Sequence, residues 1–137
     1  RAINCPKELI PSLIDELPIF FVIAALTKGV SKFRSIEDLK NKESNRILES
    51  QKILTQAGIK YKSTKNNITI YGKDKIEAQN KSIIVNTKGD HRICMSATIF
   101  SLVTGIKTKI KNFETVNTSF PGFISLIKNL GGKIVIN

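Results

Sequence analysis

Hydrophobic residues recur along this chain with two periods, and segments of each period alternate. Apolar residues at helical spacing predict helices over about residues 15–28, 42–58, 89–105 and 118–132. Alternation of apolar and polar positions predicts strands at 31–36, 81–87, 106–113 and 133–137. Segments 58–63 and 67–72 flank a polar turn and are expected to form a hairpin, and the irregular polar segment 74–81 is expected to be a connection. These elements predict a mixed α/β fold.

The order of elements occurs twice. Positions of the first half have counterparts in the second: Asp15 pairs with Asp90, Gly29 with Gly105, Lys42-Glu43 with Thr118-Ser119, and Gly58 with Gly131. This spacing indicates an internal repeat of about 75 residues. We therefore expect two α/β units docked side by side, the first without its opening strand and the second without its closing strand. Such a chain is expected to be a section of a longer repeating protein.

Charged residues continue the apolar face of one predicted helix. At 3.6 residues per turn, one face of the segment "KESNRILESQKILTQA" carries Glu43, Arg46, Ile47, Ser50, Leu54 and Ala57. The face that should pack against the core therefore ends, at the start of the helix, in a carboxylate and a guanidinium.

Every predicted helix begins with a polar cluster. The clusters are Asp15 with Glu16; Lys42, Glu43 and Arg46; Lys88, Asp90, His91 and Arg92; and Thr118 with Ser119. Helix N-termini expose free N–H groups and partial positive charge, so they favour bound anions. If the units are repeats, equivalent helix starts should share one rim of the domain. This rim is predicted to bind a doubly charged anion such as a phosphate ester or a carboxylate.

Simpler interpretations exist for each of these residues. Asp15 and Asp90 are also suitable helix N-caps. Glu43 and Arg46 could form a local i,i+3 ion pair worth a few tenths of a kcal/mol. His91, the single histidine, could be a packed polar group rather than a ligand of the anion.

Composition narrows the class of protein. A net charge of +11 in 137 residues favours anionic partners, which include nucleic acid, a membrane surface and phosphorylated small molecules, although scattered lysines usually form a solvated surface. Two cysteines suggest neither a disulfide framework nor a metal cluster, and Cys94 is expected to be buried. The run "LPIFFVIAAL" is about half as long as a bilayer span and predicts a buried helix rather than a signal or an anchor. The sequence as a whole suggests a soluble protein of a reducing compartment.

Four motifs, taken together, carry a family resemblance. "IDELP", "KNKESNR", "GDHRI" and "TSFPGF", in this order, resemble the C-terminal third of the 5-enolpyruvylshikimate-3-phosphate synthase (3-phosphoshikimate 1-carboxyvinyltransferase) family, from about Leu9 to Ile136. The resemblance implies an enolpyruvyl transferase-like inverted α/β barrel, in which each of two domains contains three βαβαββ units. Residues 1–137 would hold about two incomplete units, near 9–75 and 80–137, of one domain. The N-terminal domain would be absent.

The resemblance also implies an activity. Family members transfer the enolpyruvyl group of phosphoenolpyruvate to the 5-hydroxyl of shikimate 3-phosphate and release phosphate, by addition and elimination. It implies no metal and no organic cofactor, no nucleic-acid or membrane partner, and a cytoplasmic monomer that serves aromatic amino acid biosynthesis. The missing N-terminal domain would complete the active site, so the 137 residues alone are expected to be inactive.

The motifs assign roles to individual residues by resemblance. Asp15 matches a proton acceptor that also contacts the shikimate ring, and Glu43 matches a glutamate that transfers a proton at the methylene carbon. The other matching residues are expected to bind substrates: Lys42 both of them, and Arg46, His91 and Arg92 phosphoenolpyruvate. Two positions depart from the pattern. Thr118 stands where some members have a phosphoenolpyruvate-binding lysine, and Asn45 replaces the commoner aspartate of the "KESDR" motif.

Two other functions compete with this interpretation, and a third alternative is a structural or degenerate repeat without activity, although Asp15, Glu43, Arg46 and Arg92 occurring together argue against decay. The sister enzyme that transfers enolpyruvyl to UDP-N-acetylglucosamine shares the fold and chemistry, but neither "KESNR" nor "GDHR" is expected there. A basic nucleic-acid-binding domain would fit the isoelectric point of about 9.8. However, the lysines are not interleaved with aromatic residues that could stack on bases.

Overall fold

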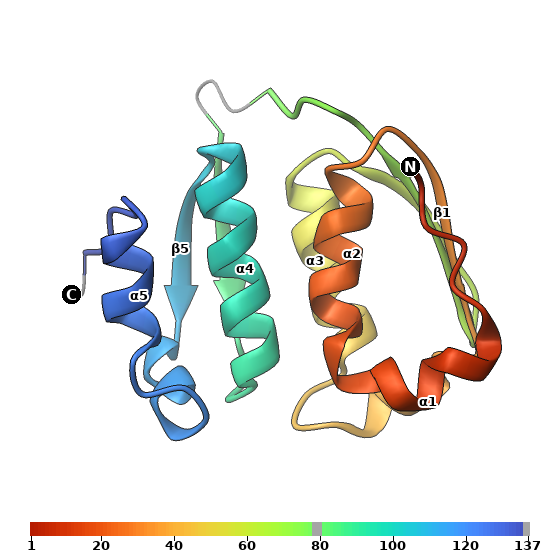
Figure 1. The fold of residues 1–137 in the computed structure, drawn as a ribbon, viewed down its shortest axis with the longest axis horizontal. Helices are drawn as coiled ribbons and strands as arrows, with labels where there is room; N and C mark the ends of the chain where they lie inside the picture. Colours follow the sequence, from red (N-terminus) through yellow and green to blue (C-terminus); the bar gives the residue numbers. More distant parts are fainter. Residues whose placement is uncertain (78–80, 136–137) are drawn as a thin grey trace.

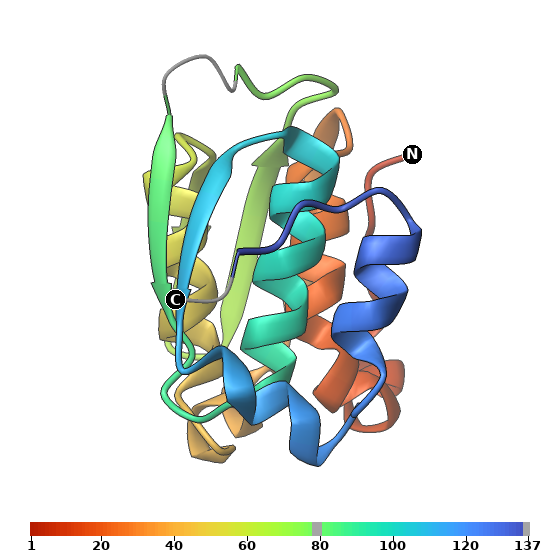
Figure 2. The ribbon, with the colours of Figure 1, turned by 90° about the vertical axis from the view of Figure 1, so that its left-hand side faces the viewer.

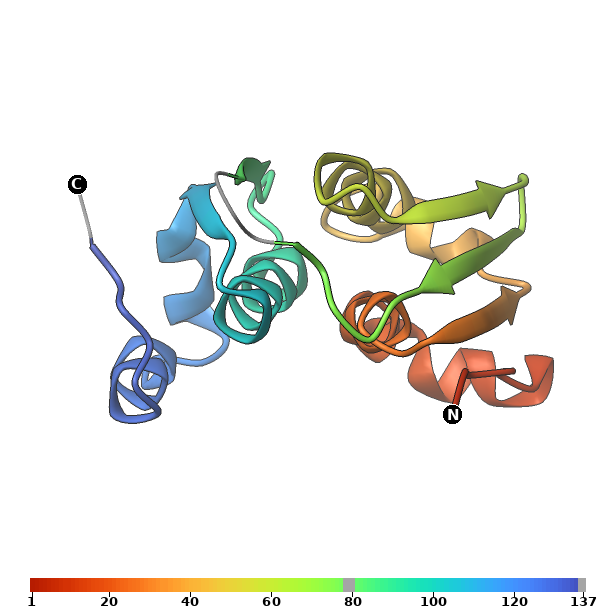
Figure 3. The same ribbon diagram turned by 90° about the horizontal axis from the view of Figure 1, so that it is seen from above.

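Two α/β halves lie side by side in the computed structural model, which describes residues 1–77 and 81–135 (Figures 1 and 3). The first half contains α1 (Ile10–Leu13), α2 (Leu17–Ala25), β1 (Gly29–Arg34), α3 (Arg46–Gln56), β2 (Lys60–Ser63) and β3 (Asn67–Gly72). The second contains β4 (Ser82–Asn86), α4 (His91–Thr104), β5 (Lys107–Lys111) and α5 (Phe123–Asn129). Short 3-10 helices occupy Lys7–Leu9, Ile14–Glu16, Glu37–Asn41 and Phe113–Thr118.

The first half folds around an antiparallel sheet with strand order β1-β3-β2. Along β1, Ser31 and Phe33 are buried against the helices, whereas Val30, Lys32 and Arg34 are exposed, as an alternating strand requires. Phe33 packs edge to face on Phe21 of α2, with ring centroids 5.0 Å apart. At the end of β3, a Cβ on Gly72 would overlap the carbonyl oxygens of Ala24 and Thr27, so only glycine lets the sheet approach α2 this closely.

The second half is built on a parallel pair of strands. β4 and β5 run side by side and are connected through α4, as Figure 2 shows. Helix α4 has many buried residues, which include Ile93, Cys94, Ala97 and Phe100. It contacts α2 and α3 on one side and β5 on the other, so its apolar residues join the two halves into one structure.

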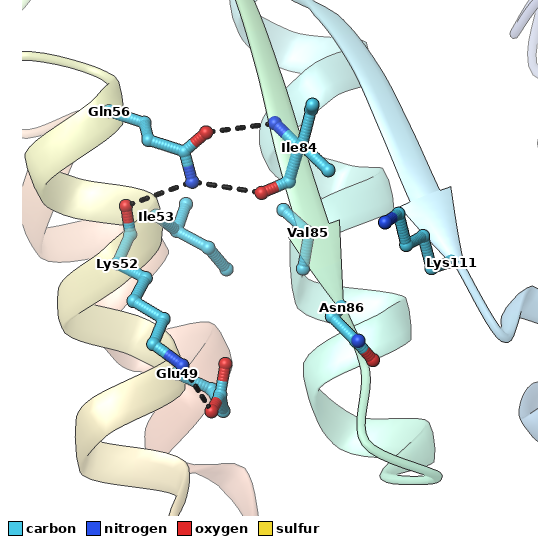
Figure 4. Close-up of a pocket in the computed structure, with 8 residues that line it drawn as sticks. All are labelled: Glu49, Lys52, Ile53, Gln56, Ile84, Val85, Asn86 and Lys111. Atoms are coloured by element: carbon cyan, nitrogen blue, oxygen red, sulfur yellow. Dashed lines mark hydrogen bonds and ion pairs between the residues drawn. The ribbon is translucent and has the colours of Figure 1, made fainter.

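The two halves also meet where α3 lies beside β4 (Figure 4). The Gln56 side-chain amide accepts a hydrogen bond from the Ile84 N–H and donates one to the Ile84 carbonyl, both at 2.9 Å. The side chain thereby satisfies the backbone of a strand edge that would otherwise be unpaired. Next to it, a small cavity of about 120 Å³ is lined by residues that include Glu49, Lys52 and Lys111.

Most predicted elements are confirmed, and the differences between prediction and structure lie mainly at the ends of the elements. The hairpin, the strands near 31–36, 81–87 and 106–113, and the buried helix in "LPIFFVIAAL" are all present. Helix α3 begins only at Arg46, because Asn45 is its N-cap and accepts a hydrogen bond from the Leu48 N–H. Helix α5 begins after Pro121 and Gly122, not at Thr118, which still belongs to a 3-10 helix. The predicted helix end at Gly29 was wrong, since α2 stops at Ala25 and Gly29 opens β1.

Two predicted segments fall partly outside the described residues. The strand expected at 133–137 includes 136–137, and the described residues 133–135 form neither helix nor strand. The connection expected at 74–81 includes 78–80, which also lie outside the description. In the part of the chain that is described, no helix combines the length and the apolar character needed to cross a membrane.

The repeated order is visible in the backbone itself. In each half a helix is followed by a strand, a 3-10 helix and a second helix, namely α2-β1 then α3, and α4-β5 then α5. Directly after β1 and β5, the chain turns through a residue with positive φ, Ser35 at 58° and Asn112 at 56°. These left-handed turns occupy equivalent places in the two halves. In each half, the turn directs the backbone from the strand toward the start of the second helix.

Candidate active site

The starts of α2, α3, α4 and α5 lie at one end of the molecule, the lower end in Figure 1. The carboxyl ends of β1, β4 and β5 point to the same end. The predicted rim of helix starts is therefore present, and its chemistry depends on which side chains meet there.

Arg46 is the centre of this rim. Its side chain is 1% exposed, and each nitrogen of its guanidinium donates to a different carboxylate. Nε donates to Asp90 Oδ2 at 2.8 Å, Nη1 to Asp15 Oδ1 at 2.8 Å and Nη2 to Glu43 Oε2 at 2.6 Å. Arginine suits this position because its planar fork offers donors in several fixed directions. The buried charge that ends the apolar stripe of α3 thus connects both halves of the protein.

Asp90 is fully buried and holds the second half to Arg46. Its Oδ2 accepts hydrogen bonds from Arg46 and from the Ser44 hydroxyl, at 2.8 and 2.9 Å. Its Oδ1 accepts from the backbone N–H groups of Arg92 and Ile93, so Asp90 is the N-cap of α4. Burial alone would raise the pKa of Asp90, but the hydrogen bond and charge of Arg46 outweigh it, and the pKa lies below its ordinary value.

Asp15 occupies the equivalent place in the first half and behaves differently. No side-chain cap is formed at the start of α2, so capping accounts for Asp90 but not for Asp15. The Asp15 side chain is 48% exposed, and its Oδ1 accepts from Lys42 Nζ at 3.0 Å as well as from Arg46. The hydrogen bond from Lys42, followed by that from Arg46, lowers the pKa of Asp15 despite partial desolvation. A half-exposed, ionised carboxylate beside a lysine is suited to contact a ligand.

Glu43 precedes α3 instead of lying in its first turn. The i,i+3 ion pair with Arg46 does form, yet Arg46 also binds two carboxylates distant in sequence, so a local pair is an incomplete explanation. The Glu43 side chain is 50% exposed, and only one of its oxygens has a hydrogen-bond partner among the described residues. It can therefore reach a ligand while Arg46 fixes its position.

Arg92, in the first turn of α4, pairs across the halves with Glu16, the neighbour of Asp15. His91 beside it is half-buried, with no hydrogen bond or ion pair to any residue that the structure describes. Thr118 donates only to the Thr115 carbonyl within its own 3-10 helix. Of the predicted site residues, the structure thus brings Asp15, Lys42, Glu43 and Arg46 into one network, and places Arg92 beside it.

Two contacts were not predicted from the sequence. Ser44, inside the "KESNR" motif, donates to Asp90, and Glu16, named above only as part of a polar cluster, binds Arg92. Ser44 could have been suspected from its place between Glu43 and Arg46, but Glu16 lies 76 residues from its partner, and no local pattern indicates that contact.

The site is an open polar rim rather than a closed pocket. A hollow of about 870 Å³ lies along α4, β5 and α5, and none of the predicted site residues lines it or the small cavity beside Gln56. The clustered ionised groups lie at the rim and not in these hollows. Its cations are Lys42, Arg46 and Arg92, and its carboxylates are Asp15, Glu16, Glu43 and Asp90.

Acid should destabilise the protein through Asp15 and Asp90. Both pKa values are lower in the folded state than the usual value of about 3.9 in an unfolded chain. Their contribution is therefore complete above about pH 5 and is lost as the pH falls through the folded-state values, because the unfolded chain takes up protons first. We expect the urea midpoint to fall between pH 5 and pH 3, and to fall less in Asp90→Asn. Equal pH dependence of the two proteins would contradict this.

Comparisons with known proteins identify a matching family, similar sequences and a similar structure. The family model described as EPSP synthase (3-phosphoshikimate 1-carboxyvinyltransferase) matches residues 2–127. The chain is 34% identical to the 3-phosphoshikimate 1-carboxyvinyltransferase of Acidiphilium cryptum over 98% of its own length and 29% of the relative's. It is 38% identical to that of Brevibacillus brevis, over 93% and 29%. The structure resembles EPSP synthase from Acinetobacter baumannii with a TM-score of 0.85 and 33% identity, over 94% of this chain and 30% of the other.

Proposed function

This chain belongs to the EPSP synthase (3-phosphoshikimate 1-carboxyvinyltransferase) family, and we propose that it forms part of an active site that transfers enolpyruvyl from phosphoenolpyruvate to shikimate 3-phosphate. The chain spans about three tenths of the length of the curated relatives it matches. We further propose a cytoplasmic, monomeric enzyme that needs no metal or organic cofactor. Both substrates would be small phosphorylated acids.

One observation carries the proposal. Arg46 joins Asp15 and Glu43, two half-exposed carboxylates, at an end of the molecule where several helix starts and two further cations lie. Proton transfer requires acid–base groups held at fixed positions, and anionic substrates require cations and helix N-termini beside them. A surface salt bridge or a simple cap would not need this combination.

Exposure and partners support the roles that the family resemblance implies. Asp15, kept ionised by Lys42 and Arg46, would accept the proton of the 5-hydroxyl, and Glu43 would transfer a proton at the methylene carbon of phosphoenolpyruvate. Lys42 would contact both substrates. Arg92 and His91 at the start of α4 would bind phosphoenolpyruvate, together with Arg46. Because three carboxylates occupy Arg46 in this structure, direct binding there would require Asp15 or Glu43 to give way.

The rest of a full-length family member would supply the remaining contacts. In our proposal, the groups that hold the shikimate phosphate and close the site lie outside these 137 residues. The chain by itself is therefore expected to release no phosphate from phosphoenolpyruvate plus shikimate 3-phosphate. Carboxyvinyl transfer by the purified 137-residue chain would overturn this part of the proposal.

A thermal-shift experiment on full-length protein containing this chain tests the substrate. Shikimate 3-phosphate should raise the melting temperature, because a ligand that binds only the folded state stabilises it. UDP-N-acetylglucosamine should leave it unchanged. Stabilisation by the UDP-sugar alone would instead favour the sister enzyme, and stabilisation by neither would argue against enolpyruvyl transfer.

Removing the charge of Arg92 should mainly weaken binding of phosphoenolpyruvate. In full-length protein, Arg92→Ala should raise the KM for phosphoenolpyruvate by roughly tenfold or more, since a charged hydrogen bond contributes about 1.5–3 kcal/mol. Arg34→Ala is a matched control, because Arg34 is exposed on β1 and its side chain makes a hydrogen bond only to Asn4 among the described residues. Steady-state kinetics would decide, and an unchanged KM in Arg92→Ala would count against the assigned role.

A further inference from the structure

Glu16 and Arg92 form an ion pair beside the Arg46 network. Glu16 ends the 3-10 helix that precedes α2, and Arg92 lies in the first turn of α4. Nη1 of Arg92 donates to both oxygens of the Glu16 carboxylate, at 2.6 and 2.7 Å. The two side chains are 30% and 47% exposed, so solvent and ligands can reach both partners.

This pair contributes little to the stability of the fold. Exposed ion pairs are typically worth about 0–1 kcal/mol, because water screens the charges and the side chains lose freedom. The hydrophobic contact between α2 and α4 already joins the two halves. Within the described chain, Glu16 is the sole ion-pair partner of Arg92. Fold stability therefore does not explain why Glu16 is paired with Arg92.

The contrast with Arg46 shows which cation can exchange its partner. Arg46 is buried, and removing it from Asp90 would leave a fully buried carboxylate unpaired, which is costly. Arg92 could release Glu16 into solvent at almost no cost, because both groups remain hydrated. Carboxylates and phosphates bind a guanidinium with the same geometry. An acid of either type can thus replace Glu16 on Arg92 without disturbing the buried network.

We propose that Glu16 is a resident counter-ion of Arg92, which the carboxylate or phosphate of an arriving substrate displaces. The inference rests on the proposed function, in which Arg92 binds phosphoenolpyruvate. Glu16 then lowers the affinity of Arg92 for every anion, because each anion must displace it. It acts as a residue that sets the affinity of the site, without touching the reacting atoms.

Neutralising Glu16 should therefore tighten binding. By calorimetric titration of full-length protein with phosphoenolpyruvate at low salt, Glu16→Gln should lower the Kd roughly two- to fivefold, the range that an exposed ion pair allows. Glu8→Gln is the matched control, because Glu8 is also exposed and its side chain has no hydrogen bond or ion pair among the described residues. The gain should disappear in Glu16→Gln combined with Arg92→Ala.

The outcomes separate the two proposals. If wild-type protein binds phosphoenolpyruvate and Arg92→Ala weakens it, but Glu16→Gln binds equally or more weakly, the counter-ion inference is overturned and the function stands. If Arg92→Ala leaves the wild-type Kd unchanged, Arg92 does not bind phosphoenolpyruvate as proposed. The counter-ion inference, which depends on that role, is then overturned as well. A gain in Glu16→Gln that persists without Arg92 also overturns the inference, because it would reflect net charge alone. Circular dichroism of each variant confirms that it is folded.

Discussion

Arg46→Met is expected to lower the free energy of unfolding by about 3–5 kcal/mol, the cost of leaving a buried charge unpaired. Methionine fills much of the same volume, so the loss would come mainly from the missing charge and hydrogen bonds rather than from a cavity. Asp90 is fully buried and would lose its charged partner, while the exposed Asp15 and Glu43 could turn toward water. Urea titration at pH 7 measures the change.

Arg92→Met provides the comparison for this experiment. Arg92 also pairs with a carboxylate from the other half, but that pair is largely exposed, so its loss should cost less than about 1 kcal/mol. The double variant Arg46→Met with Asp90→Asn should recover part of the stability, because it removes the unpaired charge. If Arg46→Met were as stable as Arg92→Met, Arg46 would not be the structural centre of the rim.

The repeated architecture explains why the polar network lies between the halves. Arg46 binds Asp15 and Asp90, which occupy equivalent places in the two units. Phe123, the first residue of α5, stands where α3 has Arg46, so one cation serves both aspartates. Asp90 caps its helix, whereas Asp15 forms no cap and is half-exposed. The two equivalent positions therefore differ in burial and in hydrogen bonding.

Local patterns predicted the elements better than their ends. The apolar stripe of Ile47, Leu54 and Ala57 placed α3 correctly, and the alternation around 58–72 identified the hairpin. The 3-10 helices at Glu37–Asn41 and Phe113–Thr118 were missed, since they depend on turns such as that at Asn112 rather than on an apolar period. Thr118 and Ser119 therefore precede α5 instead of opening it.

The candidate site was predictable in its location but not in its connections. Polar residues at repeated helix starts indicated a shared rim, and Asp15, Lys42, Glu43 and Arg46 do meet there. Whether an aspartate caps its helix depends on backbone geometry, which composition does not reveal. The pairing of Arg92 with Glu16 depends on how α2 and α4 pack, so only the three-dimensional structure identified it.

Glu43→Gln in full-length protein is expected to reduce turnover by about 10²–10⁴-fold, the usual contribution of a general acid or base. Glutamine has the same shape and keeps an oxygen that can accept from Arg46 Nη2, so the rim should retain its geometry. It cannot transfer the proton, however. Binding of phosphoenolpyruvate should therefore be nearly unchanged while kcat falls, as steady-state kinetics and direct titration would show.

Glu37→Gln is the matched control for this variant, because Glu37 is exposed in the 3-10 helix that leads to the same loop, and its turnover should equal that of wild type. A loss of affinity in Glu43→Gln as large as the loss of turnover would mean that Glu43 only positions Arg46 or the substrate. Turnover within tenfold of wild type would exclude a general acid–base role. In that case the Glu43 carboxylate would only form its ion pair with Arg46. Asp15 would remain as the candidate acid–base group that Arg46 holds in place.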